Sequence, residues 1–552
     1  MDDVIVEAFV RHFVNEPDRD TNGAERDRHD RRRVLAALAG TGLTAVAGCS
    51  AGSDPTPSTT DTPASTTDAE APASTTTQSD TETTTTETGP SVRIETVAVE
   101  SDPPRQFQSV PVSVTVTNAG GESFDGRVTA TTGDADDEVG SVTIPPGESV
   151  THTAEFEWRA VGDADLTVTV QRNDEQVTTA TRTVTVRQYP ADPVEVDGTT
   201  LTCGDGSAYY AGSTLSYVNN SPSNVEPENL NVSFTTLSNA GGTVCRLWAH
   251  APFWADFQTV SEPYTYEEAW FDYLDEIVAA AKRHDVRLVL SMFNGNPAYG
   301  ELTEDDLGTN VPQFVRWADD AETRNDFFDS DECMEMYKDW VQTLLTHENS
   351  ITGLEYRNDP TIMMWELGNE IQKSPPKVGE SIRPWIEEAG SFVKEIDDRT
   401  LLTTGSYGHQ GRNAFVEEAS ADPIDVASVH YYPSPENYDV PDDRVTEILA
   451  ETIRTTHEEI GKPLYVGEYN WGVSSDATTP LTERNDALGR LHDVMLDRDV
   501  AVSNLWTMVS WSRNDVGSPG NHQVYAASDE GTITELRRHA ERMTEKSTSS
   551  SL

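Results

Sequence analysis

The run Thr361-Ile362-Met363-Met364-Trp365-Glu366-Leu367 is mostly apolar and continues directly into the polar sequence Gly368-Asn369-Glu370. A short apolar run of this kind is typical of a buried strand. In a parallel β/α fold, the side chains that follow such a strand lie at the end of the sheet where the chemistry takes place. The stretch 361–370 therefore predicts a buried strand with Glu370 at its functional end.

The same pattern recurs along the C-terminal two thirds of the chain, where apolar strand-like runs alternate with helical stretches. Eight such β/α units in about 350 residues predict an α/β fold, a (β/α)8 TIM barrel with loop insertions, over residues 195–545. The predicted helices are Tyr266–Arg283, Cys333–Thr346, Ile382–Ile396, Val445–Ile460 and Arg484–Asp497. The other seven predicted strands are Tyr209–Ser216, Thr243–Ala249, Arg287–Phe293, Leu401–Ser406, Val426–Tyr431, Leu464–Tyr469 and Val502–Met508.

Residues 91–190 show a different period. Several short alternating segments, such as 110–116 and 166–170, are separated by Gly-, Pro- and Asn-rich turns. This spacing predicts an all-β sandwich, which resembles the immunoglobulin-like modules of secreted microbial proteins. A glycan-binding module needs a row of exposed aromatic side chains, and this segment has few, so a spacer or adhesion role is favoured and glycan binding is the alternative.

Residues 50–90 contain 21 Ser or Thr residues, seven acidic residues and no basic one. Such a composition cannot bury enough apolar surface to offset chain entropy and predicts a disordered linker.

Residues 1–49 have the features of an export signal. Three arginines at 31–33 precede the small apolar run 36–47, which is too short to span a membrane. The paired arginines resemble a twin-arginine signal. The sequence Val46-Ala47-Gly48-Cys49 resembles a lipobox, in which Cys49 is lipidated. We therefore expect an extracellular or cell-surface protein with a membrane tether through Cys49; plain secretion with an incidental Cys49 is the alternative.

The charge balance limits the classes of partner. With 95 acidic and 39 basic residues the formal net charge is −56. A nucleic-acid-binding protein needs a clustered basic face, so nucleic acid is excluded as a partner. So many acidic residues in a chain with 11 Trp also indicate a protein that is folded in concentrated salt, where this self-repulsion is screened.

Two carboxylates follow predicted strands on different sides of the barrel mouth, Glu370 after the fourth and Glu468 in the seventh. Two carboxylates that face each other across a cleft are what glycoside hydrolysis requires, because one protonates the leaving oxygen while the other attacks the anomeric carbon or activates water. The alternative is that both are rim glutamates paired with Arg or Lys. The neighbouring Asn369, His430 and Trp506 favour the catalytic interpretation.

The stretch 356–370 resembles the acid/base strand of glycoside hydrolase family 5, in particular its endo-β-1,4-mannanase branch. Further matching motifs follow in order at 244–248, 288–291, 313–317, 430–432 and 467–469. The resemblance spans about residues 209–511, and together with the export signal and acidity it suggests a haloarchaeal-type exported lipoprotein.

The resemblance implies a retaining mechanism in which Glu370 is the general acid/base and Glu468 is the nucleophile. It assigns Arg246 to stabilising the ionised nucleophile, which we expect to have a lowered pKa, whereas the acid needs a raised one. Glu366 is expected to be a buried support.

The resemblance also implies a set of substrate-binding side chains. Asn369 would bind the sugar 2-hydroxyl, Tyr432 would lie near the nucleophile, and Trp506 would stack under the sugar in the −1 subsite. The full set of implied substrate-binding residues is Arg246, Trp248, Asn369, His430, Tyr432 and Trp506.

The chain departs from the family pattern at two places. Ile371 and Gln372 replace the usual Pro-Arg after the acid/base, and the loop at 294–297 has no tryptophan. Both changes bear on the choice of substrate. His409 and His522 are expected to be ordinary surface histidines in loops; contact with the substrate is the alternative.

No metal-ligand cluster is visible, and hydrolysis requires no cofactor. Three further cysteines, Cys203, Cys245 and Cys333, lack metal-binding spacing; buried thiols are the default, and a Cys203–Cys245 disulfide is the alternative.

The sequence thus predicts a monomeric endo-β-1,4-mannanase that acts on mannan or glucomannan. The alternatives are a β-1,4-glucanase, an exo-β-mannosidase and a catalytically silent glycan-binding surface protein.

Overall fold

The structure is a computed structural model, and we describe the part of the chain between residues 89 and 548. The described residues are 89–132, 135–218, 224, 226–250, 259–296, 308–375, 377–406, 411–433, 444–473, 481–513 and 522–548. The predicted signal, Cys49, nearly all of the predicted linker and His409 lie outside these ranges.

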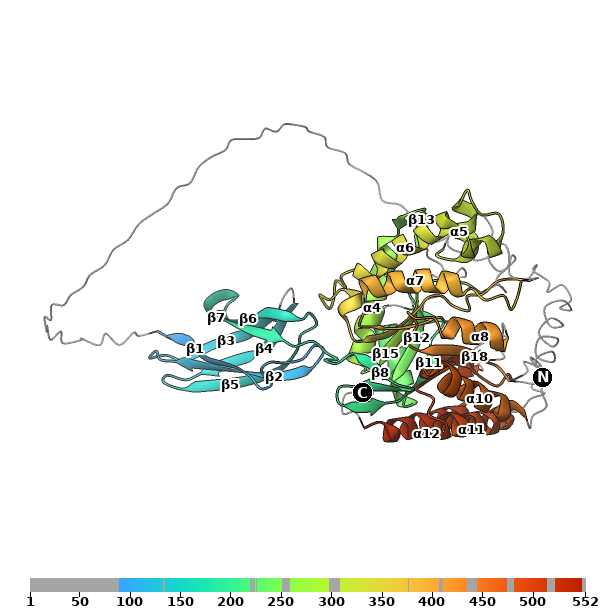
Figure 1. Ribbon diagram of the computed structural model, residues 1–552. Coiled ribbons are helices and arrows are strands. Elements are labelled where there is room, and N and C mark those ends of the chain that lie inside the picture. Colours follow the sequence, from blue (N-terminus) through green and yellow to red (C-terminus); the bar gives the residue numbers. More distant parts are fainter. Residues whose placement is uncertain are drawn as a thin grey trace, which may run out of the picture. The chain divides into compact units, whose positions relative to one another are not determined.

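The N-terminal described segment folds into two antiparallel sheets (Figure 1). One has the order β1-β2-β5 and the other β4-β3-β6-β7, and side chains from both sheets form one core. Along β2, every second side chain points into this core and the side chains between them point to the outer face of the sheet, as the alternating sequence predicts. The description as an immunoglobulin-like module stays a prediction. The strands are β1 (Val92–Val99), β2 (Ser109–Asn118), β3 (Phe124–Thr132), β4 (Ala135–Ile144), β5 (Ser149–Glu157), β6 (Gly162–Arg172) and β7 (Glu175–Val186).

The larger segment contains an eight-stranded parallel sheet in the order β17-β16-β15-β12-β11-β20-β19-β18. A parallel bridge between Thr403 and Val426 brings its two edges together, so the sheet forms a nearly closed barrel, in agreement with the predicted TIM barrel. The eight strands are β11 (Tyr210–Thr214), β12 (Val244–Trp248), β15 (Arg287–Ser291), β16 (Ile362–Glu366), β17 (Leu401–Thr403), β18 (Ala427–Tyr431), β19 (Leu464–Tyr469) and β20 (Val502–Leu505).

A small antiparallel sheet with the order β10-β9-β8 packs at the amino-terminal end of the barrel. Its Val194, Leu201 and Ala208 share a core with barrel residues such as Val244 and Val289. Sequence reasoning placed the start of the barrel domain at 195 without this sheet. Its strands are β8 (Val194–Asp197), β9 (Thr200–Cys203) and β10 (Gly206–Ala208).

Helices surround the barrel (Figure 1), and all five predicted helices are present. The predicted helix 445–460 continues from α10 into a π-helical turn at 455–460. Four further α-helices lie in the described residues and were not predicted: α3, α5, α8 and α12. The helices are α3 (Pro227–Asn239), α4 (Glu268–Arg283), α5 (Val311–Trp317), α6 (Asp331–Thr346), α7 (Arg383–Ile396), α8 (Arg412–Ala419), α10 (Val445–Arg454), α11 (Leu481–Asp497) and α12 (Glu530–Lys546). Minor elements are β13 (Val260–Glu262), β14 (Thr265–Tyr266), β21 (Met508–Val509), β22 (Val524–Tyr525), η3 (Arg324–Phe328) and η4 (Tyr356–Asn358).

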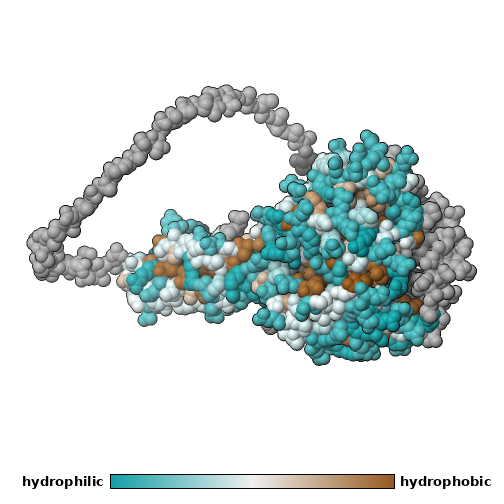
Figure 2. Space-filling view, in the orientation of Figure 1, coloured by the Kyte–Doolittle hydropathy of each residue, from teal (hydrophilic) through white to brown (hydrophobic). Residues whose placement is uncertain are grey.

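The face of the molecule in Figure 2 is mostly hydrophilic, with apolar colour confined to small areas. Among the described residues, no helix has the length and apolar character needed to cross a bilayer. Cys203, Cys245 and Cys333 are all buried and none of them forms a disulfide, so the predicted alternative of a Cys203–Cys245 disulfide is wrong.

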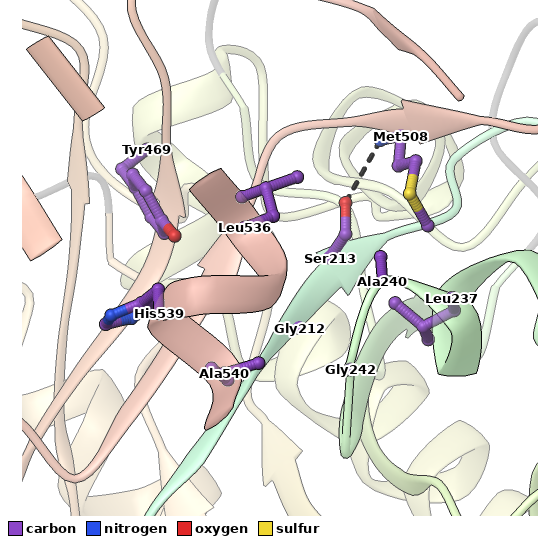
Figure 3. A pocket seen from close by; sticks show the side chains of 11 residues that line it. Gly212, Ser213, Leu237, Ala240, Gly242, Tyr469, Met508, Leu536, His539 and Ala540 are labelled. Carbon is purple, nitrogen blue, oxygen red and sulfur yellow. Dashed lines mark hydrogen bonds between the residues drawn. The ribbon is translucent and has the colours of Figure 1, made fainter. Parts of the chain in front are cut away.

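A small apolar pocket lies between β11, α3 and α12 (Figure 3). Small residues such as Gly212, Ala240 and Ala540 line it, and Ser213 Oγ accepts a hydrogen bond from the Met508 amide beside it. Gly212 is required by close packing, because a Cβ there would lie 1.7 Å from the carbonyl oxygen of Val244. No carboxylate lines this pocket, so it is a packing feature and not the predicted active site.

The β1–β7 segment offers a test of its own. Asn118 is fully buried, and its side chain accepts from the amides of Ser91 and Gly120 and donates to the carbonyls of Glu122 and Ile144. Asn118→Ala leaves these groups without their partner and should lower the local free energy of unfolding by about 2–3 kcal/mol.

Amide hydrogen exchange in β2 and β5 measures this loss. The control is Thr115→Ala, which removes an exposed hydroxyl pair with Thr151 and should cost less than about 0.5 kcal/mol. Equal protection in the two variants would contradict the role given to Asn118.

Candidate active site

The predicted site residues come together at the carboxyl ends of the barrel strands. Arg246 lies in β12, Glu366 ends β16, His430 lies in β18 and Glu468 lies in β19. Asn369 and Glu370 follow β16, Tyr432 follows β18 and Trp506 follows β20. Because all eight strands are parallel, these ends share one mouth of the barrel.

Arg246 lies at the centre of this arrangement and is completely buried. Its Nε and Nη2 donate to the two carboxylate oxygens of Glu366, each at 2.8 Å. Nη1 donates to Glu468 Oε1 at 2.7 Å, and Nη2 also donates to Asn369 Oδ1 at 2.9 Å. Glu366 therefore has the buried, hydrogen-bonded position expected of a support, and the guanidinium joins β12, on which Arg246 lies, to β16 and β19.

Glu370 and Glu468 face each other with His430 between them. His430 Nδ1 lies 2.8 Å from Glu370 Oε1 and 3.6 Å from Glu468 Oε2. One carboxylate oxygen of each glutamate and the His430 nitrogen all lie within 4.8 Å of one another. Carboxyl groups about 5–5.5 Å apart are typical of retaining glycosidases, whereas inverting enzymes have a wider gap. The separation thus favours direct attack by one carboxylate.

Each carboxyl group has its own additional donor. The Tyr432 hydroxyl donates to Glu468 Oε2, and Asn296 Nδ2 donates to Glu370 Oε2. Glu370 itself has φ of 49°, a left-handed conformation that is uncommon outside glycine and is often found at functional sites. The turn that contains it also needs Gly405, since a Cβ there would lie 2.3 Å from the Gly368 carbonyl oxygen.

The protonation states of the site follow from burial and charge. Burial raises the pKa of Glu370 to about 8, although Arg246 and the Asn296 hydrogen bond act in the opposite direction. Burial also lowers the pKa of His430 to about 4, so the imidazole is neutral at ordinary pH. Glu370 can therefore hold a proton near neutral pH, as a general acid must.

The expected lowering of the nucleophile's pKa is not found. Burial and the neighbouring Glu370 carboxyl raise the pKa of Glu468, and His430, Arg246 and the Tyr432 hydroxyl counteract this rise. Glu468 accepts directly from a guanidinium and a phenol, whereas among the described residues Arg246 acts on Glu370 through its charge, without a hydrogen bond. The negative charge of the pair is therefore best placed on Glu468, because opposite charges and donors favour the ionised form.

Aromatic side chains line the same mouth. Trp506 is partly exposed, and its ring lies 5.9 Å from that of Trp248. Trp248 is only 1% exposed and also contacts the Arg246 guanidinium, 4.7 Å from the ring centre. Trp248 therefore packs against both Arg246 and Trp506. Direct contact of Trp248 with a sugar stays a prediction.

Sequence reasoning missed two residues of the site. Asn296 contacts Glu370, and the only sequence signal was the unusual loop 294–297. His522 was expected at the surface but packs edge-on against Tyr432, with ring centres 5.1 Å apart, and burial lowers its pKa to about 4. The expectation for His522 is wrong because the chain after β20 folds back towards β18, which no local pattern reveals.

The same atoms define the one candidate metal-ligand group among the described residues, Glu370, His430 and Glu468. His430 Nδ1 and Glu370 Oε1 are in hydrogen-bond contact, and the two carboxylates also accept from Arg246, Tyr432 and Asn296. A pair of carboxyl groups that each accept hydrogen bonds from protein donors is the arrangement expected of an acid–base pair.

The charge assignment can be tested by titration. In 13C-glutamate NMR spectra, Glu370 should titrate near pH 8 and its signal should vanish in Glu370→Gln. Glu468→Gln removes a neighbouring negative charge and should lower the pKa of Glu370 by roughly one unit or more. Glu458→Gln, at an exposed position, is the control. An unchanged Glu370 titration in Glu468→Gln would show that the charge does not reside on Glu468.

Tyr432 provides a second test. Tyr432→Phe removes a donor to the charged Glu468, a bond of about 1.5–3 kcal/mol, and should slow turnover roughly tenfold to a hundredfold. The matched control is Tyr431→Phe, because the Tyr431 hydroxyl donates to the Val445 carbonyl instead. Steady-state kinetics of both variants on one substrate measure the difference, and similar rates would remove Tyr432 from the reacting site.

Residues 196–468 match the family described as glycoside hydrolase family 5 β-mannosidase-like. Mannan endo-1,4-β-mannosidase 5 of Arabidopsis thaliana is 37% identical over 216 residues, 35% of this chain and 48% of that protein. Mannan endo-1,4-β-mannosidase 2 of Oryza sativa subsp. japonica is 31% identical over 328 residues, 54% of this chain and 68% of that protein. The chain thus spans about half to two thirds of the length of these relatives.

Solved structures show the same fold. The endo-1,4-β-mannanase of Rhizomucor miehei aligns with a TM-score of 0.51 at 20% identity, covering 64% of this chain and all of that one. The endo-β-1,4-mannanase of Thermotoga petrophila gives 0.50 at 21% identity, covering 61% and 77%. The facing carboxylates at the mouth of a parallel barrel and the long match to the rice relative lead to one conclusion: the chain belongs to the β-mannosidase-like group of glycoside hydrolase family 5.

Proposed function

We propose that this glycoside hydrolase is a retaining endo-β-1,4-mannanase that cleaves mannan or glucomannan. The observation that carries the proposal is the pair Glu370 and Glu468, with carboxylate oxygens within 4.8 Å of one another and unlike surroundings. A silent glycan-binding barrel does not need a protonated and an ionised carboxyl in this geometry.

The reaction proceeds in two displacements. Glu370 gives its proton to the glycosidic oxygen while the Glu468 carboxylate attacks the anomeric carbon, so that the C–O bond to the leaving sugar breaks and an ester to Glu468 forms. Water then attacks the same carbon, Glu370 takes a proton from the water, and the ester bond to Glu468 breaks. Both carboxyl groups return to their initial states.

The surrounding residues support these steps. Arg246 and Tyr432 stabilise the charge on Glu468 before attack and after release. Asn369 is held by Arg246 and by Asn294, to which its Nδ2 donates at 3.3 Å, so its amide is oriented for the sugar 2-hydroxyl. Trp506 offers a ring face on which the sugar can stack.

The choice of mannan rests on the names of the relatives and on the motif resemblance. Gln372, in place of the usual arginine, leaves a β-1,4-glucanase or an exo-β-mannosidase as second candidates. We also propose that the chain is exported, which the arginines at 31–33 support, and lipid-anchored at Cys49, which the 46–49 motif supports. We propose further that it works in concentrated salt, which the net charge of −56 supports, and that it is a monomer.

The product profile tests the substrate. The full chain, assayed in molar salt on mannans, glucans and xylans, should release reducing ends from glucomannan or galactomannan with a rapid fall in viscosity. Activity on carboxymethyl cellulose alone would refute the mannan preference, and release of mannose without a viscosity fall would indicate exo action.

Two variants test the mechanism. Glu370→Gln and Glu468→Gln should each lose at least about a thousandfold in turnover, since acid catalysis and nucleophilic attack are both required. NMR of the first product should show the β-anomer, and a 2-fluoro-glycoside should add its mass to the wild type but not to Glu468→Gln. Glu458→Gln should behave as wild type; full activity in either catalytic variant would refute the two-carboxylate scheme.

A further inference from the structure

Arg324 contacts the loop that carries Asn296, the donor to the acid/base carboxyl, although no motif marks it. It begins the short helix η3, and its guanidinium contacts the segments on either side of Glu370. Nη2 donates to the carbonyl oxygens of Gly295 at 3.3 Å and Asn296 at 3.1 Å, and Nε donates to Ser374 Oγ at 3.3 Å. One side chain therefore joins the loop after β15 to the segment that follows Glu370.

The loop that Arg324 holds carries the donor to Glu370. Asn296 Nδ2 donates to Glu370 Oε2, while the Asn296 carbonyl accepts from Arg324. The Gly295 amide donates to the Asn369 carbonyl at 2.9 Å, so this loop is also tied to the residue before Glu370. The position of the Asn296 side-chain amide thus depends on two contacts of its loop, one with Arg324 and one with the Asn369 carbonyl.

The segment after Glu370 is fixed in the same way. Asn325, the residue after Arg324, accepts from the Ser374 amide at 2.8 Å and donates to the Ser374 carbonyl at 3.2 Å. Together, Arg324 and Asn325 hold Ser374 by its side chain and by its backbone.

The environment of Arg324 is unusual for a purely structural arginine. Burial alone shifts its pKa, lowering it to about 10, and no carboxylate of the described residues offsets this effect. Its hydrogen bonds go to neutral oxygens, and its Nη1 is buried without a partner among the described residues. An unpaired buried cation costs stability, which points to a functional reason for its place.

We propose that Arg324 is a positioning residue for acid/base catalysis, which holds Asn296 so that its amide donates to Glu370 Oε2. This inference rests on the proposed function and deepens it. The Asn296 donor fixes the carboxyl group relative to the scissile bond and stabilises the carboxylate that remains when Glu370 has given up its proton. Arg324 acts through Asn296 and does not itself touch the reacting atoms.

The proposal predicts a selective defect. Leaving groups that depart without a proton do not need Glu370 as an acid, whereas sugar leaving groups do. Arg324→Met should lower kcat/KM on mannooligosaccharides roughly tenfold and change kcat/KM on 2,4-dinitrophenyl β-mannobioside less than about twofold, because kcat/KM reports the first displacement, before Glu370 acts as a base. The basic limb of the pH profile should also move upward, because Asn296 lowers the pKa of Glu370.

A mutant cycle separates positioning from general loss of structure. Asn296→Ala should give the same substrate selectivity, and the double variant Arg324→Met/Asn296→Ala should be no slower than Asn296→Ala alone. Arg324→Lys, which retains the charge but only one donor group, should recover part of the rate. The control Arg412→Met removes an exposed arginine paired with Glu459 and should match wild type.

Three results would overturn the proposal: equal losses on both classes of substrate, additive losses in the double variant, or an unchanged basic limb. If the wild type cleaves no β-mannoside, the proposed function fails, and the positioning role is then tested alone by 13C-glutamate NMR. In that case Arg324→Met should raise the pKa of Glu370, and an unchanged titration would refute the contact chain. Near-UV circular dichroism verifies that each variant is folded.

Discussion

The active site depends on one buried cation, the Arg246 guanidinium. Its bonds to Glu366, Glu468 and Asn369 join β12, β16 and β19 at the mouth of the barrel. Burying a charge is costly unless it is paired and fully hydrogen-bonded, and here two carboxylates share the single guanidinium. The three charged groups together carry one net negative charge.

This charge balance explains why two similar glutamates can have different roles. Adding a second negative charge to the buried cluster is unfavourable, so Glu370 retains a proton, whereas Glu468 can ionise because it accepts directly from Arg246 and Tyr432. Neutral His430 lies between the two carboxyls without adding charge. The difference in protonation arises from unequal contacts in a site where burial raises the pKa of both carboxyls.

The barrel supplies the rigidity that this arrangement needs. Its parallel strands bring residues 246, 370, 430 and 468 to one end, and the small β8–β10 sheet closes the core at the other. Loops complete the chemistry: Asn296, which follows β15, donates to the carboxyl that follows β16, and Arg324 on a short helix donates to the Asn296 carbonyl. Strands therefore place the carboxylates, and loops adjust the acid.

The sequence by itself determined the eight strand runs, five of the helices and the two glutamates, because apolar periodicity and the polar residues at strand ends are local properties. The separation of the two carboxyls, the burial that raises the pKa of both, and the contacts of Asn296, Arg324 and His522 were decided only by the tertiary structure. Asn296 and Glu370 are 74 positions apart, and Arg246 and Glu468 are 222 apart. The distances between such residues, and how deeply each is buried, depend on how the barrel closes. Burial in turn sets the pKa values, so no local sequence pattern could supply the distances or the pKa values.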